Sequence, residues 1–527
     1  MAGPRIELDL VSHWMMQEGL RIPLPALFYI GGISIRGVWY IGLFSLARAW
    51  TIKLPSTNQK RSKSGPFLME KRSTFGPNLN TTKDICISMR DLLLEWQELW
   101  IPEYVPRDID QSILFGKTKK VVVLTGCRRS GKTYLMYQMM DDLQKKKGID
   151  RESIVYLSFE DERLPWTTET LTGLLPTLYE LYGEREYYLF LDEIHHIPDW
   201  DRWVRRIYDR HQNINIVLAS SSSKLSKREI PEALRGRTAV LEVFPLSFWE
   251  FLRFKGVPEV DPARSTTLKL AKYKAHLREY LEFGGFPEVV LENTKRKKIS
   301  IVQDYFRTII ALDIAERYNV KNRRALHDYI VMVLSQTYHS TSKMHRILKG
   351  QGMNIGKQTI LAYPQYLEEV YMIFFVPIFS TKVKDRLYYP QKVYFIDNSF
   401  IHHIITKFSE DLGRGLENAA FLHLLRTQGR EGIFYWKEKD KEAGSGHEVD
   451  FVLVKAGHAH SLIQVCLDVT DKRTMEREMI GLELASKELD CDNLMVVTLD
   501  HEGVEKFNGK TIRFIPFMKW SVGSKDN

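Results

Sequence analysis

An eight-residue segment in the first third of the chain constrains its fold more than any other feature. Gly126-Cys-Arg-Arg-Ser-Gly-Lys-Thr133 directly follows Val121–Thr125, a run of β-branched and apolar residues typical of a buried strand. Apolar residues then recur at helical spacing from Leu135 to Leu143. A strand, Gly-x-x-x-x-Gly-Lys-Thr and a helix in this order predict a phosphate-binding loop in a parallel α/β sheet. The alternative is a glycine-containing turn with a chance Lys-Thr pair.

The residue types of this loop suit a nucleoside triphosphate. Gly126 and Gly131 let the backbone turn so that successive N–H groups face the phosphates, and the following helix adds its partial positive charge. Lys132 would reach the β- and γ-phosphates, and the Thr133 hydroxyl would bind Mg²⁺. We therefore expect ATP and Mg²⁺ as cofactors. The predicted nucleotide-binding residues are Gly126, Cys127, Arg128, Arg129, Ser130, Gly131, Lys132 and Thr133.

A second predicted strand, Tyr187–Leu191, ends in two acids. Parallel strands end at the edge of the sheet where ligands bind. Asp192 would hold Mg²⁺ through water, and Glu193 would deprotonate the attacking water. The alternative is a solvated acidic turn. His195 and His196 follow, and such a pair suggests a metal, but no third ligand is evident nearby, so we expect an ordinary segment at the start of a helix.

Two later segments supply candidate sensors of the nucleotide. The predicted strand Ile214–Ala219 ends in four serines, of which we expect Ser221 to contact the γ-phosphate. A serine-rich turn that caps the next helix is the alternative. Arg235 and Arg237 are candidates for an arginine that stabilises the transition state on a neighbouring subunit, or are surface residues. The predicted catalytic set is Lys132, Glu193, Ser221, Arg235 and Arg237.

Together these motifs resemble a prokaryotic AAA+ ATPase family in which an AAA domain precedes a domain of unknown function, and the archaeal branch is most similar. The resemblance covers about residues 89–505 and is carried by the loop at 126–133, Leu191–Trp200, Leu234–Arg237, Phe244–Leu252 and Gly284–Glu288. Members usually have Thr-Gly before the sensor serines, whereas this chain has Ala219-Ser220. The resemblance implies an ATP-hydrolysing switch or remodeller, and an arginine acting in trans implies a homo-oligomer.

The first 88 of the 527 residues differ in composition from the rest. They contain 11 Lys and Arg against five Asp and Glu, while the remaining residues contain 64 against 61, so the net charge of +9 is weak evidence for binding of nucleic acid.

The apolar runs Leu24–Ile35 and Gly37–Ala47 are separated by Arg36, and each is too short to cross a bilayer. We expect Met89 to be the natural start and residues 1–88 to be an unstructured or spurious extension; a membrane anchor is the alternative. Four cysteines without a CxxC pair fit a cytoplasmic chain.

Residues 256–400 are predicted to form a helical lid and a winged helix. Two helical patterns, Ser340–Leu348 and Gly356–Tyr371, flank a glycine-containing turn and precede two apparent strands at 374–379 and 393–396. We expect this part to contact double-stranded DNA. The predicted contacts are Lys357, Gln358, Thr359 and Tyr363 on the second helix, and Lys382, Lys384 and Arg386 in the presumed wing. Winged helices also dock proteins, so a protein partner stays open.

Residues 401–527 resemble the restriction-endonuclease-like fold of the PD-(D/E)XK type. In that fold an acid on a helix, an Asp and Glu-x-Lys cluster to bind Mg²⁺ and activate water. This chain has Glu417 and Asp450, but Gln464-Val-Cys466 stands where Glu-x-Lys belongs. We therefore expect a degenerate metal site at Glu417, Asp450 and Gln464 without nuclease activity. An ATP-dependent nuclease is the alternative.

The sequence thus predicts an α/β chain of four parts. The boundaries are 1–88 for the extension, 89–255 for a P-loop AAA+ parallel-sheet domain, 256–400 for the lid and winged helix, and 401–527 for the nuclease-like part. The expected function is Mg²⁺-dependent ATP binding and hydrolysis by a switch or remodeller acting on DNA. A signalling ATPase that docks a protein partner is the second hypothesis.

Overall fold

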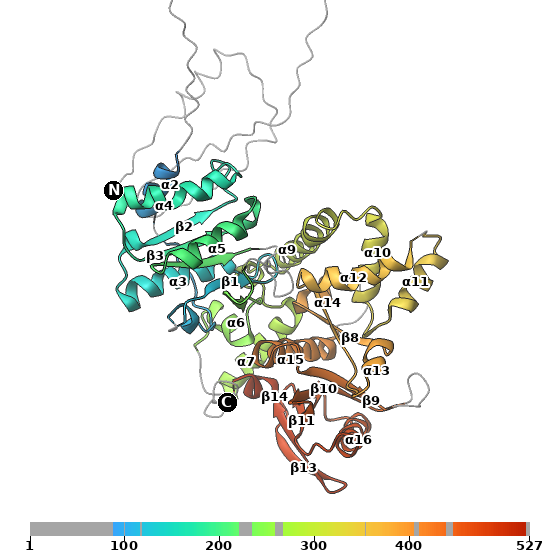
Figure 1. The fold of residues 1–527 in the computed structure, drawn as a ribbon. Helices are drawn as coiled ribbons and strands as arrows, with labels where there is room; N and C mark the ends of the chain where they lie inside the picture. Colours follow the sequence, from blue (N-terminus) through green and yellow to red (C-terminus); the bar gives the residue numbers. More distant parts are fainter. Residues whose placement is uncertain are drawn as a thin grey trace, which may run out of the picture. The chain divides into compact units, whose positions relative to one another are not determined.

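The computed structural model describes residues 88–99, 101–115, 118–220, 234–258, 267–353, 355–404, 411–438 and 446–522 (Figure 1). All of them belong to one unit of the chain. Within these ranges, no helix combines the length and the apolar character needed to cross a membrane. The apolar runs near the N-terminus and the candidate sensor Ser221 lie outside the described residues.

A parallel five-stranded sheet of order β2-β3-β4-β1-β5 organises the first part. Its strands are β1 Val121–Thr125, β2 Ile154–Ser158, β3 Tyr187–Asp192, β4 Ile214–Ala219 and β5 Thr238–Glu242. This confirms the predicted α/β class and the parallel sheet of a P-loop AAA+ domain. The order separates β1 from β3 by one strand, so the loops that follow both strands leave the same edge of the sheet.

Helices cover both faces of this sheet (Figure 1). Val122 and Leu124 of β1 are buried on the face that α3 covers, whereas Val121 and Val123 are buried on the face covered by α4 and α5. Strand residues alternate between faces, so an unbroken run of apolar residues can fill both cores. The helices and short 3₁₀ turns of this part are α2 Met89–Glu98, η2 Ser112–Phe115, α3 Lys132–Lys147, η3 Arg151–Ser153, α4 Thr168–Tyr182, η4 Ile194–His196 and α5 Trp200–Arg210.

The middle part is mostly helical and holds a small antiparallel sheet of order β6-β8-β7. Its π-helix η8 continues directly from α9. The elements are α6 Phe248–Phe254, α7 Thr267–Phe283, α8 Pro287–Leu291, α9 Lys295–Thr308, η8 Ile309–Glu316, α10 Arg323–Leu334, β6 Tyr338–His339, α11 Thr341–Gly350, α12 Lys357–Glu369, β7 Ile373–Val376, α13 Val383–Tyr388 and β8 Gln391–Phe395.

One detail of the middle part corrects the sequence predictions, and another adds to them. Lys384 and Arg386 of the presumed wing lie on the short helix α13, between β7 and β8. Tyr363 does not face outward for DNA, because its side chain is fully buried and its ring packs edge-on against Tyr329. A tyrosine three residues after Ile360 falls on the buried stripe of α12, and that stripe decides its direction. Lys357, Gln358 and Thr359, in contrast, are exposed.

The last part contains a six-stranded mixed sheet of order β13-β14-β12-β11-β10-β9. Some of its buried apolar residues, such as Phe451 and Ile463, join those of the middle part in one continuous cluster, whereas others, such as Val449 and Val452, form a separate cluster. The boundary that we predict at residue 400 therefore crosses a shared core and stays a prediction. The elements are α14 Asn398–His403, α15 Leu412–Gln428, β9 Ile433–Lys437, β10 Glu448–Lys455, β11 His458–Cys466, α16 Lys472–Leu489, β12 Leu494–Thr498, β13 Gly503–Phe507, β14 Lys510–Pro516 and α17 Phe517–Val522.

Candidate nucleotide-binding site

The loop between β1 and α3 depends on its two glycines. Gly126 has φ +147°, and a Cβ there would lie 2.2 Å from the carbonyl oxygen of Val243. Gly131 has φ +95° and is the N-cap of α3. Both conformations are costly for any residue with a side chain. The sequence spacing therefore produces a tight turn that leads directly into a helix N-terminus, where free N–H groups favour an anion.

Lys132 extends its ammonium group back over the loop. Its Nζ donates hydrogen bonds to the carbonyl oxygens of Gly126 at 3.1 Å and Cys127 at 3.0 Å, and the side chain is buried. This geometry holds a positive charge at the centre of the turn. Burial raises the pKa of the neighbouring Cys127 thiol to about 12, so Cys127 is a neutral packing residue.

Thr133 and Asp192 meet across the edge of the sheet. The Thr133 Oγ1 donates a hydrogen bond of 2.7 Å to Asp192 Oδ2, and the Tyr156 hydroxyl donates to the same oxygen at 3.3 Å. Burial and the adjacent charge of Glu193 raise the pKa of Asp192 to about 6. A hydroxyl and a carboxylate side by side are the hard oxygen ligands that Mg²⁺ prefers, so these two residues fit the metal predicted for them.

Glu193 follows Asp192 in a left-handed backbone conformation, with φ 52°. Its N–H donates to the carbonyl oxygen of Ala219 at the end of β4, so its backbone is fixed to the neighbouring strand. The His195 Nδ1 lies 3.2 Å from Glu193 Oε2 and 2.9 Å from Ser220 Oγ. The sequence analysis found no third potential metal ligand near the histidine pair. The structure supplies one in Glu193, because Glu193, His195 and His196 place potential ligand atoms within 4.8 Å of one another.

Two loop arginines connect the site to helices of the middle part. Arg128 donates from Nε and Nη2 to the two carboxylate oxygens of Asp313, each at 3.2 Å. Arg129 lies over the ring of Tyr305, with 5.7 Å from the guanidinium carbon to the ring centroid. Two charged residues predicted to bind nucleotide thus also contact α9 and the π-helix η8.

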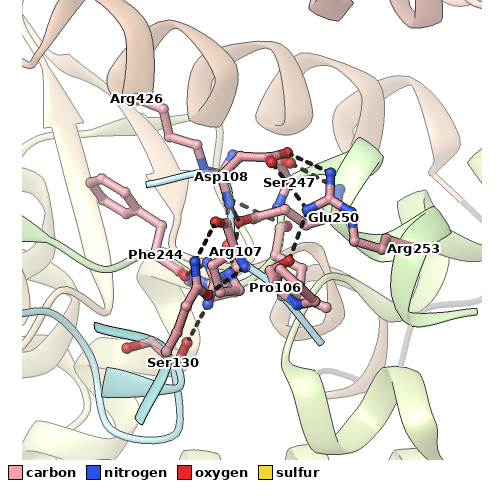
Figure 2. A network of polar contacts seen from close by, with 12 residues as sticks. Pro106, Arg107, Asp108, Ser130, Phe244, Ser247, Glu250, Arg253 and Arg426 are labelled. Carbon is pink, nitrogen blue, oxygen red and sulfur yellow. Dashed lines mark hydrogen bonds and ion pairs between the residues drawn. The ribbon is translucent and has the colours of Figure 1, made fainter. Parts of the chain in front are cut away.

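A buried arginine that the sequence analysis did not identify, Arg107, stabilises the loop through hydrogen bonds to backbone carbonyl oxygens. Arg107 donates from Nη1 to the Ser130 carbonyl oxygen at 3.0 Å and from Nη2 to the Phe244 carbonyl oxygen at 2.8 Å. Its Nε donates to Glu250 at 2.7 Å (Figure 2). Burial opposes ionisation of Glu250, but the charge of Arg107 holds the pKa of Glu250 below its usual range. No local pattern marks Arg107, because its partners lie 23 to 143 residues away.

The candidate sensor arginines are placed differently from each other. Arg237 is bound within its own chain, since its Nε donates to Asp209 Oδ1 at 2.9 Å and its Nη2 donates to Oδ2 at 3.2 Å. Arg235 is exposed. Their roles on a neighbouring subunit remain predictions, as does the role of Ser221.

The acids predicted for the nuclease-like part do lie together, away from this loop. Glu417 of α15 and Asp450 of β10 both contact Lys392 of β8, at 3.1 and 2.5 Å. Gln464 is adjacent, because its Oε1 accepts a hydrogen bond from the Asp450 backbone N–H at 3.0 Å. The sequence missed Lys392 because it lies on a strand of another sheet.

Comparisons with known proteins place the two main segments. Residues 118–252 match a family described as an AAA domain, and residues 274–411 match a domain of unknown function (DUF8612). One solved structure that was matched is the Aeropyrum pernix ORC1 protein in complex with DNA. It is 14% identical, has a TM-score of 0.28, and the match covers 59% of this chain and 94% of that chain.

Two relatives match over most of their lengths. Uncharacterized protein MJ1544 of Methanocaldococcus jannaschii is 34% identical over 431 residues, which are 79% of this chain and 91% of that protein. An uncharacterized protein of Haemophilus influenzae is 30% identical over 367 residues, which are 69% of this chain and 86% of that protein. The chain therefore belongs to the same family as these two proteins, in which an AAA+ type nucleotide-binding domain is followed by a domain of unknown function.

Proposed function

We propose that this protein binds ATP with Mg²⁺ and hydrolyses the β–γ phosphoanhydride bond. The contact between Thr133 and Asp192 carries the proposal, because it joins the end of the phosphate-binding loop to the end of β3 at a distance of 2.7 Å. Lys132 lies in the same loop with its ammonium group against backbone carbonyls that phosphate oxygens would replace.

The chemistry follows from the positions of these groups. Lys132 and the N-terminus of α3 would neutralise the phosphates and stabilise charge that develops on the leaving β-phosphate oxygen. Glu193 would accept a proton from water, whose oxygen attacks the γ-phosphorus while the bond to the bridging oxygen breaks, giving ADP and phosphate. Mg²⁺, when bound, supplies charge neutralisation at the β- and γ-phosphates, and Thr133 and Asp192 would hold it.

Two substitutions separate binding from hydrolysis. Lys132→Ala is expected to weaken ATP binding roughly 10- to 100-fold, because a charge-assisted hydrogen bond contributes about 1.5–3 kcal/mol. Glu193→Gln is expected to keep ATP binding and to lower turnover by about 10²- to 10⁴-fold. Fluorescent-nucleotide titration and phosphate release measure the two effects.

Two further substitutions serve as controls for this test. Lys145→Ala on the exposed side of α3 and Glu184→Gln on an exposed turn should leave both binding and turnover unchanged. Turnover of Glu193→Gln at the parental rate would contradict the assignment of the base.

We further propose that the middle part contacts double-stranded DNA as a winged helix. The order α10, β6, α11, α12, β7, β8, with β6 and β7 both paired to β8, supports this reading. The first turn of α12 exposes Lys357, Gln358 and Thr359, and α11 exposes further cations, Lys343, Arg346 and Lys349. Such exposed cations at helix ends and edges suit phosphate contacts.

ATP turnover with and without duplex DNA tests this second proposal. Stimulation by DNA that falls steeply with added salt is expected, because phosphate contacts release counterions. Lys357→Glu should weaken the stimulation, whereas Lys455→Glu, an exposed lysine at the end of β10, should not. Stimulation by a co-purifying protein but not by DNA would instead favour the signalling hypothesis, and Asp450-dependent nicking of plasmid DNA would favour the nuclease.

A further inference from the structure

A group of three carboxylates outside the nucleotide site converges on one buried lysine. The Lys392 Nζ lies 2.5 Å from Asp450 Oδ1, 3.1 Å from Glu417 Oε1 and 3.5 Å from Glu448 Oε1. Its side chain is 1% exposed. Three carboxylates around a central cation are the arrangement that a hard divalent metal takes in proteins. Here an ammonium group stands at the centre.

The lysine reaches this position from a different sheet. It lies on β8, where it is paired with Tyr338 of β6 and Val376 of β7. Glu417 belongs to α15, and Glu448 and Asp450 belong to β10. A single side chain therefore joins the small sheet of the middle part to the six-stranded sheet of the last part.

Donors of the chain already occupy two of the three carboxylate oxygens that do not face Lys392. The Val465 N–H donates to Asp450 Oδ2 at 2.9 Å, and the Tyr338 hydroxyl donates to Glu448 Oε2 at 2.5 Å. The Tyr394 hydroxyl donates to Glu417 Oε1 at 2.7 Å, the same oxygen that faces Lys392. A site built to accept a metal would leave carboxylate oxygens facing a common open point.

Gln464, the expected third ligand, is also engaged elsewhere. Its Oε1 accepts from the Asp450 N–H, and its Nε2 donates to Glu478 Oε2 at 2.6 Å. The cavity that Lys392 and Glu417 line measures about 10 Å³, which is about the space of one water molecule. The residues present do not fit the metal that a nuclease of this type requires.

We propose that the ammonium group of Lys392 is the permanent cation of the cluster formed by Glu417, Glu448 and Asp450. It takes the place of the divalent metal and makes this part a non-cleaving element that is fixed to the small sheet. The expected degenerate nuclease site is thus closed by a lysine from another strand. Lys392 and its three carboxylates lie outside the nucleotide site, so this proposal is independent of the ATPase proposal.

Binding of Mn²⁺ to the nucleotide-free full chain tests the proposal, with electron paramagnetic resonance of free Mn²⁺ as the readout. The parent and the Asp450→Asn variant are expected to bind the same amount of Mn²⁺, because the cluster of the parent binds none. Lys392→Ala leaves three uncompensated carboxylates and should gain one bound Mn²⁺ per chain that the parent does not bind. The double variant Lys392→Ala with Asp450→Asn should lose this gain, and Lys392→Arg, which keeps a cation, should not show it.

A matched control is Lys298→Ala. Lys298 is also a buried lysine, but it is paired with the single carboxylate of Glu279 at 2.6 Å, so its removal should create no Mn²⁺ site. Mn²⁺ should raise the melting temperature of Lys392→Ala and leave that of the parent unchanged. If Lys392→Ala folds only when Mn²⁺ is present, that result also supports the proposal. The proposal would be overturned if the parent bound Mn²⁺ and Asp450→Asn removed that binding; this measurement does not depend on whether a variant of Lys392 folds. It would also be overturned if Lys392→Ala folded but bound no additional Mn²⁺.

Discussion

At the scale of single residues, Asp192 shows how a functional group conflicts with the fold that holds it. Its carboxyl is buried at the end of β3 beside Glu193, and both effects disfavour its charge. The Thr133 hydroxyl offsets only part of this penalty. Residues of this kind are common at active sites because a ligand, here Mg²⁺ as we propose, relieves the repulsion.

This conflict predicts the sign of a pH effect on stability. The folded pKa of Asp192, about 6, is above the ordinary value of 3.8. The stability associated with this group is therefore fully present below about pH 4 and is lost as the pH rises through 6. Without nucleotide, Asp192→Asn should raise the free energy of unfolding by about 3 kcal/mol at pH 8, and by roughly half as much at pH 5.

Urea unfolding at the two pH values measures this change. Asp209→Asn is a control of opposite sign, because the hydrogen bond from Arg237 lowers the pKa of Asp209, so its removal should destabilise the chain at pH 8. An Asp192→Asn variant that is equally affected at pH 5 and pH 8 would show that the charge of this group is not the cause.

At the scale of elements, the π-helix η8 connects the loop at residues 126–133 to the middle part through Asp313 and Arg128. Ile309–Glu316 continues α9 without a break, and Asp313 lies within it. π-helical segments are rare and are frequent at functional positions, because the extra residue in the turn redirects side chains. The ion pair between Arg128 and Asp313 is therefore a physical link between the loop at residues 126–133 and these helices.

Removing this link should change nucleotide affinity. Phosphate oxygens compete with Asp313 for the Arg128 guanidinium, so Asp313→Asn is expected to tighten ATP binding about two- to fivefold, since a partly exposed ion pair contributes at most about 1 kcal/mol. Titration with a fluorescent nucleotide measures the change. Asp328→Asn, which removes an exposed partner of Arg324 on α10, should have no effect. Weaker binding by Asp313→Asn would mean that the pair positions Arg128 for the nucleotide instead of competing with it.

The sequence predicted the elements themselves with uneven success. The strands β1, β3 and β4 begin and end within one residue of their predicted limits, because buried apolar runs mark them locally, and α3 was predicted from its apolar spacing without limits. The helix α13, which carries Lys384 and Arg386 of the presumed wing, was not predicted. Its Val383, Leu387 and Tyr388 are exposed and α13 buries no residue, so no periodic signal of burial marks this helix.

At the scale of the whole molecule, the polar network of Arg107 holds segments that are far apart in sequence. Arg107 connects the N-terminal segment to the phosphate-binding loop, to the turn after β5 and to α6 (Figure 2). On the same turn, Arg426 of α15 donates to the Pro245 carbonyl oxygen at 2.9 Å. The part that holds the five-stranded sheet and the last part therefore meet at the turn after β5.

Loss of Arg107 should therefore be severe. Arg107→Ala leaves Glu250 charged and buried, which we expect to cost about 3–5 kcal/mol of unfolding free energy. Denaturant unfolding provides the measurement. Arg253→Ala is the matched control, because Arg253 also bonds to the same segment, through the Pro106 carbonyl oxygen and Asp108, but at a partly exposed position where at most about 1 kcal/mol is expected. Equal costs for the two variants would refute the special role of the buried pair.

The sequence alone determined the chemistry that is written in consecutive residues. The loop from Gly126 to Thr133, and Asp192 with Glu193, were readable because turn geometry and phosphate chemistry fix residue types at short spacings. Only the tertiary structure decided that Arg107 supports the loop, that Asp313 binds Arg128 and that Lys392 fills the carboxylate cluster. These contacts join residues 23 to 185 positions apart. A buried charge carries no periodic signal, and its partner is chosen by how the sheets and helices pack rather than by what lies beside it in the chain.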